Sequence, residues 1–274
     1  MLGIRRLFIL LLTAAPALLS AVDLTPWFGR DKLIEVRPWA SYQWYPKIDT
    51  DQGKVNKQGR NVFFGTSASI ASDNKYSLSG ESLFSRTNQH SFTLENMRIT
   101  VRRQWLNDIV GDPFTLVTGA TVTVPTTRAL RDYNTIYHGK VEFEGHAAVG
   151  REASCGAFWN SRWWAAVALG KADIGCPWLR GRATFEKNFW NQHQWKIFAE
   201  GTGGMGQRRL SLISPFPGYG KVKYRTIDAG AGYSFLIDGY GRSLTAEYSV
   251  RVWGENAPIQ AQNVTFCLLI PFCL

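Results

Sequence analysis

The sequence predicts an all-β protein: a single closed antiparallel transmembrane β-barrel of about twelve strands, after a cleaved signal peptide. Three observations predict this. A basic and apolar leader opens the 274-residue chain. After it, apolar residues recur with period two between breaks rich in Gly, Pro and Asn. The clearest alternating stretches match the roughly 9–11 residues of a tilted membrane strand better than the roughly 5–6 of a globular one.

The leader has three parts. Residues 1–6 are a short start containing Arg5 and Arg6, residues 7–12 are apolar, and small residues lead up to Ala21. This order is typical of a secretory signal. A transmembrane anchor is a poorer interpretation, because the apolar run is shorter than the roughly 20 residues that span a bilayer. We therefore expect a signal peptide at 1–21, an N-terminal periplasmic segment at 22–32 and an outer-membrane barrel at 33–274.

The strands are expected wherever alternation is sustained. Between 33 and 45, Ile34, Val36 and Tyr42 share one face while Glu35 and Arg37 share the other. In the fourth strand the apolar parity changes between Leu94 and Met97, which predicts a β-bulge at Glu95 and Asn96. The expected ranges are 33–45, 61–71, 75–85, 91–105, 113–124, 137–149, 162–170, 178–187, 193–202, 224–237, 243–253 and 263–272.

The connections alternate in length. Tight turns at 72–75, 188–192 and 238–241 alternate with long loops at 46–60, 126–136 and 203–223. Short turns at one end and long loops at the other are typical of a membrane barrel whose short side faces the periplasm. The connection at 150–161 is longer than this pattern requires.

A soluble β-sandwich shows the same period, so the lipid-facing interpretation depends on strand length and on aromatic residues at strand ends, such as Trp44, Trp105 and Trp163. With these features, residues 33–272 resemble the outer-membrane β-barrel proteins of Gram-negative bacteria. The last strand alternates toward Phe272, the terminal aromatic that barrel-assembly machinery reads in that class, although Cys273 and Leu274 come after it. The resemblance implies an outer-membrane location and contact with outer-membrane lipid.

Charge and composition indicate the partners. Only 19% of residues are charged and 14% are aromatic, which opposes disorder and a nucleic-acid-binding tail. The formal charge of +10 falls to +8 without Arg5 and Arg6. The proposed outer loops hold thirteen basic and five acidic residues, also +8. We expect lipopolysaccharide head groups or acidic solutes at this end, and no nucleic acid.

The inward faces are expected to hold the solute site. Basic and acidic side chains are nearly balanced there, and twelve strands enclose a narrow lumen. One hypothesis is a porin-like barrel that passes or binds small polar solutes, anionic ones included; another is a non-conducting surface-binding barrel with a salt-bridged lumen. The residues predicted to line the lumen are Arg37, Arg98, Arg102, Lys140, Glu142, Glu144, His146, Arg180, Arg182 and Arg251.

A third hypothesis, an outer-membrane hydrolase, has little support in the sequence. The four histidines lack a His-x-Ser spacing, and His90 and Ser91 fall on opposite strand faces. We expect no catalytic site and no cofactor. The cysteines lack zinc-ligand spacing, so no metal site is expected, and disulfides and free thiols both remain open. They are Cys155, Cys176, Cys267 and Cys273.

Overall fold

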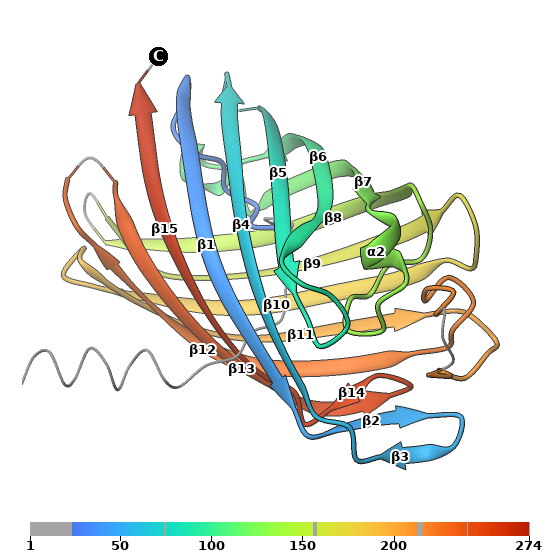
Figure 1. The fold of residues 1–274 in the computed structure, drawn as a ribbon. Helices are drawn as coiled ribbons and strands as arrows, with labels where there is room; N and C mark the ends of the chain where they lie inside the picture. The colour runs from blue at the N-terminus through green and yellow to red at the C-terminus, as the bar shows by residue number, and fades with distance from the viewer. Residues whose placement is uncertain (1–23, 74, 156–157, 213–215, 240, 274) are drawn as a thin grey trace, which may run out of the picture.

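The computed structural model describes residues 24–73, 75–155, 158–212, 216–239 and 241–273. They form a closed antiparallel barrel of twelve strands, in which neighbours follow chain order and β1 closes against β15 (Figure 1). The predicted fold class and strand count are confirmed. The strands are β1 (Leu33–Tyr45), β4 (Gly59–Ser72), β5 (Tyr76–Arg86), β6 (Thr93–Leu106), β7 (Thr115–Pro125), β8 (Glu142–Cys155), β9 (Phe158–Ala172), β10 (Trp178–Phe189), β11 (His193–Gly204), β12 (Arg225–Leu236), β13 (Ser243–Glu255) and β15 (Gln262–Cys273).

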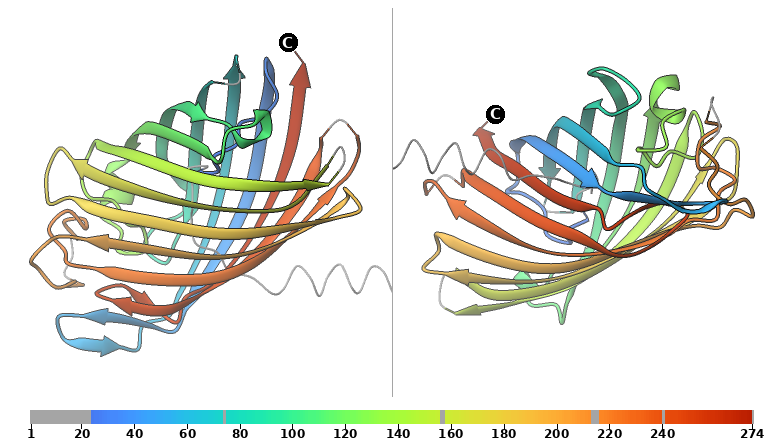
Figure 2. Two further views of the ribbon diagram at one scale, coloured as in Figure 1. Left: turned by 180° about the vertical axis from the view of Figure 1, so that it is seen from behind. Right: turned by 60° about the horizontal axis from the view of Figure 1, so that its bottom comes forward.

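The two ends of the barrel differ as predicted (Figures 1 and 2). At the short-turn end, where β1 begins and β15 ends, the connections are brief and include the 3₁₀ helix η1 (Asp108–Val110). At the long-loop end lie helix α2 (Thr127–Leu130) and a small sheet of β2 (Lys47–Thr50), β3 (Gly53–Val55) and β14 (Pro258–Ile259). The connection at 150–161 conforms after all, because β8 and β9 extend into it.

The bulge in β6 lies at the predicted place. Leu83 is opposite Asn96 while the next residue, Phe84, is opposite Leu94, so Glu95 is the extra residue. As a result Glu95 and Asn96 are both buried inside the barrel, although they are neighbours in sequence.

The predicted start of the strand at 137–149 was wrong. The expected strand at 137–149 begins only at Glu142, and Tyr137 lies buried in the loop before it. The chain turns into the barrel here because the Tyr137 hydroxyl donates a hydrogen bond to Glu95 Oε1 at 2.6 Å. Alternating polarity therefore continues past the point where the strand leaves the wall.

The barrel is apolar outside and polar inside. Large side chains such as Ile99, Leu169 and Ile197 are 60%, 56% and 62% exposed on the outer face. Buried apolar residues form only two small clusters among the described residues, one at each end. A face this apolar is stable against lipid and not against water. No helix in the described ranges is long and apolar enough to cross a membrane.

Candidate functional site

The barrel encloses a chamber of about 450 Å³ with a charged wall. Of the described residues, seven basic and eight acidic side chains line it, so the formal charge of this wall is −1. The near-neutral lumen expected from the sequence is therefore present. The basic lining residues are Arg37, Arg98, Arg102, Arg180, Arg182, Lys196 and Arg251, and the acidic ones are Glu81, Glu95, Glu142, Glu144, Glu186, Glu200, Asp228 and Glu247.

Eight of the ten predicted lumen residues line this chamber. His146 is buried in the wall beside Gly119, where an added Cβ would lie 2.4 Å from His146 Nε2. Lys140 was placed wrongly: it precedes β8, is exposed, and its backbone N–H donates to Asp173 Oδ1 at 2.8 Å. The strand that was to direct Lys140 inward starts two residues later, at Glu142.

Among the described residues, four ion pairs join residues directly opposite in neighbouring strands, one of them Arg162 with Glu186 at 2.6 Å. Arg98 contacts Glu81 at 3.2 Å, Arg182 contacts Glu200 at 3.2 Å, and Arg251 contacts Asp228 at 2.8 Å. Because opposite residues share a face, the inward alternation of each strand is enough to bring these charges together.

Two further pairs reach across an intervening strand. Glu144 on β8 contacts Arg180 on β10 at 2.6 Å, and the β9 residues opposite them are Gly170 and Ala168, whose side chains are absent or small. Lys196 on β11 contacts Glu247 on β13 at 2.5 Å, above Gly232 of β12. A Cβ at Gly232 would lie 2.7 Å from Lys196 Cε and 3.1 Å from Glu247 Cγ. The missing side chain therefore leaves the space in which these two charges meet.

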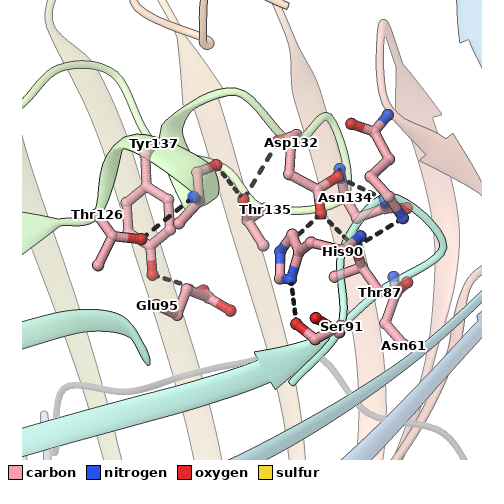
Figure 3. Close-up of polar contacts among 12 residues, drawn as sticks. Asn61, Thr87, His90, Ser91, Glu95, Thr126, Asp132, Asn134, Thr135 and Tyr137 are labelled. Carbon is pink, nitrogen blue, oxygen red and sulfur yellow. Dashed lines mark hydrogen bonds and ion pairs between the residues drawn. The ribbon is translucent and has the colours of Figure 1, made fainter. Parts of the chain in front are cut away.

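At the long-loop end, residues 126–141, here called the inner loop, fold into the barrel (Figure 3). Thr126 caps α2 by accepting from the Ala129 N–H at 3.3 Å. Further along, Asp132 receives a hydrogen bond from Thr87 Oγ1 at 2.5 Å and lies 3.1 Å from His90 Nε2. Residues 134–138 line the chamber. The inner loop thus forms one end wall.

His90 and Asp132 join two loops that are distant in sequence. The side-chain interaction with the Asp132 carboxylate is the main cause that raises the pKa of His90, and partial burial opposes it. The pair therefore favours a protonated His90 held against a buried carboxylate. The sequence did not predict this contact, because no local spacing connects residues 90 and 132.

The other loops cover the inner loop. One buried apolar cluster joins Tyr133 of the inner loop to Tyr45, at the end of β1, and to three residues of the connection between β11 and β12, which are Leu210, Tyr219 and Tyr224. The Tyr219 hydroxyl donates to the Tyr133 carbonyl at 2.7 Å. Burial raises the pKa of Tyr219 and Tyr224, so both hydroxyls stay neutral. The long-loop end is consequently a packed lid.

At the short-turn end, residues 24–32, here called the N-terminal segment, enter the lumen. Leu24 is 3% exposed and packs in a cluster with Ala148, Trp164 and Ala166, with Trp27 beside it. A Cβ added at Gly150 would lie 2.7 Å from Pro26 Cγ, so that position accommodates the segment only as glycine.

Polar contacts fix the N-terminal segment in place. Trp27 Nε1 donates to Asp108 Oδ1 at 3.1 Å, and the Arg162 guanidinium lies 4.9 Å from the Trp27 ring centroid. Arg102 donates to the Thr25 carbonyl at 2.9 Å. Leu24 and Thr25 line the chamber, so the segment forms its second end wall. No sequence motif marked these residues.

The hydrolase hypothesis gains no support from these contacts. His90 Nδ1 lies 3.0 Å from the backbone oxygen of Ser91, not from its hydroxyl. Among the described residues, no three His, Cys, Asp or Glu side chains are grouped as metal ligands. Of the cysteines, Cys176 is a free thiol.

Comparison with solved structures identifies the fold as that of the outer-membrane β-barrel proteins. The COG4313 outer-membrane channel of Pseudomonas putida F1 is 9% identical, with 92% of this chain and 100% of that chain covered and a TM-score of 0.58. The NanC porin is 8% identical, with 86% and 98% covered and a TM-score of 0.56. The translocator domain of the autotransporter NalP from Neisseria meningitidis is 9% identical, with 90% of each chain covered and a TM-score of 0.50.

No family model and no curated protein matches the sequence. At these identities the structural likeness establishes the fold alone.

Proposed function

We propose that the protein is a porin-like barrel of the outer membrane that passes or binds small polar solutes. The observation that carries this proposal is the inversion of polarity: a charged chamber of about 450 Å³ lies inside a barrel whose outer face is apolar. Lipid stabilises such an outer face, and water fills such an interior. The COG4313 channel and the NanC porin, which share the fold, support the same function.

The chamber favours solutes that carry hydrogen-bonding groups or charge. The arginines proposed to contact solute are Arg37, Arg98, Arg102, Arg180, Arg182 and Arg251, with Glu142 and Glu144 beside them. Its volume suits one small molecule and not a polymer, because ligand pockets for drug-sized molecules measure about 300–1,000 Å³. The basic long loops would raise the local concentration of anionic solutes at that mouth.

The proposed orientation has the short turns in the periplasm and the long loops outside. In that orientation the basic loops face lipopolysaccharide, and the C-terminal strand ending near Phe272 would be read by the barrel-assembly machinery. Export by the signal peptide at 1–21 belongs to the same proposal.

A non-conducting barrel is the second candidate. It is favoured by the ion pairs across the wall and by the two end walls formed by the inner loop and the N-terminal segment. Planar-bilayer recording separates the two functions. A porin-like barrel should give discrete single-channel conductance steps. The recording is also made at raised voltage, so that steps appear even if the inner loop and the N-terminal segment close the chamber at low voltage. Protein that inserts stably in vesicles yet never gives a conductance step would refute the pore function and favour the second candidate.

A further inference from the structure

Three basic side chains lie on the outward face of the barrel, in the half nearest to the short turns. They alternate with residues that face inward, such as Arg102 and Glu186. Each of the three is directly opposite an aromatic residue of the neighbouring strand, and opposite residues share a face. The pairs are Arg103 with Tyr76, Arg151 with Trp163, and Lys187 with Trp195.

Arg103 has the best-formed surroundings. Its guanidinium carbon lies 3.8 Å from the centroid of the Trp105 ring and 5.7 Å from that of Tyr76. Trp105 Nε1 donates to Thr118 Oγ1 at 2.8 Å, which fixes the ring. A guanidinium held between two rings keeps its N–H edges free for an acceptor.

These cations differ from those inside the barrel because they have no carboxylate partner. None of the three forms an ion pair with any described residue. Lys187 Nζ donates to Asn160 Oδ1 at 2.8 Å, which leaves its charge uncompensated. In this half of the outward face, the described strand residues include no Asp or Glu. The charge there is complementary only to an anion from outside the chain.

We propose that Arg103, Arg151 and Lys187 bind the head groups of anionic phospholipids in the leaflet at the short-turn end, with Arg103 as the tightest site. The proposal rests on the proposed function, because it requires the outer face to be in lipid. A phosphodiester oxygen accepts from the guanidinium, while the adjacent Tyr76 and Trp105 rings lie at the level of the head groups. Each cation strengthens such contact by about fivefold.

Native mass spectrometry of the purified barrel, titrated with phosphatidylglycerol or phosphatidylcholine, tests the proposal. The wild-type protein should retain phosphatidylglycerol in preference to phosphatidylcholine. R103Q should weaken phosphatidylglycerol binding by about fivefold, and the R103Q/R151Q/K187Q variant by roughly a hundredfold, since the effects multiply. R103K should bind with intermediate affinity, because the charge remains but the planar group is lost.

The matched control is R60Q/R86Q, which removes two exposed cations at the long-loop ends of β4 and β5. This variant should weaken phosphatidylglycerol binding by less than R103Q does, because among the described contacts neither Arg60 nor Arg86 lies over an aromatic ring as Arg103 does. Millimolar inorganic phosphate should not displace the lipid. The proposal is overturned if the triple variant keeps wild-type affinity or if phosphatidylcholine binds equally well. Failure of the wild-type protein to insert into vesicles of either lipid would instead refute the proposed membrane function.

Discussion

Removal of the Trp27 ring should release the N-terminal segment from the lumen. W27A eliminates the hydrogen bond from Trp27 Nε1 to Asp108 and the contact with the Arg162 guanidinium. A hydrogen bond to a charged acceptor contributes about 1.5–3 kcal/mol and a partly exposed cation–π contact about 0.5–1 kcal/mol. The lower ends of both ranges give about 2 kcal/mol, which changes the ratio of docked to undocked segment by roughly 30-fold.

Hydrogen exchange of residues 24–32 measures this ratio directly. In W27A the backbone amides of the N-terminal segment should exchange about 30-fold faster than in the wild-type protein. W27F keeps a ring beside Arg162 but loses the donor, so its increase should be about tenfold. In planar bilayers, W27A should also spend more time in its highest conductance level, because one end wall of the chamber opens.

The control variant is W190A, at the same end of the barrel, whose side chain is 86% exposed and lies outside the N-terminal segment. It should leave the exchange of residues 24–32 unchanged. If W27A exchanges within about threefold of wild type, the hydrogen bond and the cation–π contact do not hold the segment, and the energy estimate is refuted.

Two further predictions concern the long-loop end and the lumen wall. The pKa of His90 is raised above its usual value of about 6.5, so its pairing with Asp132 stabilises the inner loop fully below that pH and less as the pH rises through the raised pKa. Trypsin cleavage of the inner loop should therefore increase with pH more in the wild-type protein than in H90Q. A ratio of the two cleavage rates that does not change with pH would contradict this. G232V places a side chain between Lys196 and Glu247, and it should reduce the free energy of unfolding by about 2 kcal/mol and the melting temperature by roughly 4–8 °C. A231V, on the outward face, should leave the melting temperature unchanged. Equal melting temperatures for the two variants would show that the barrel wall adapts to the added side chain without loss of stability.

The barrel was predictable because each strand repeats one simple rule many times. Period-two alternation assigns a face to every residue, and the register then brings inward charges such as Arg251 and Asp228 together without further information. The bulge at Glu95 was visible for the same reason, since an extra residue reverses the parity of the rest of its strand.

The end walls were not predictable from that rule. Lys140 continues the alternation of β8, but it precedes the strand and is exposed, because alternation carries no signal for where a chain leaves the wall. The contacts of His90 with Asp132 and of Trp27 with Asp108 join segments 42 and 81 residues apart. Such contacts depend on how loops close over a lumen whose width is set by the complete barrel.

The net positive charge of the chain does not lie in the wall of its chamber, so the loops and the chamber act on a charged solute in different ways. The sequence without its leader arginines carries +8, while the chamber wall carries −1, so the surplus lies outside the chamber. Unpaired cations on the loops act at long range and attract any anion. Inside, a solute reaches Arg182 or Arg251 only by competing with carboxylates already at 3.2 Å and 2.8 Å. Separating a buried arginine from its carboxylate is costly unless each charge gains a new partner. Only a solute that carries both an anionic or accepting group and a cationic or donating group supplies both partners. In the proposed function, attraction of anions therefore occurs at the mouth and discrimination between solutes occurs in the chamber.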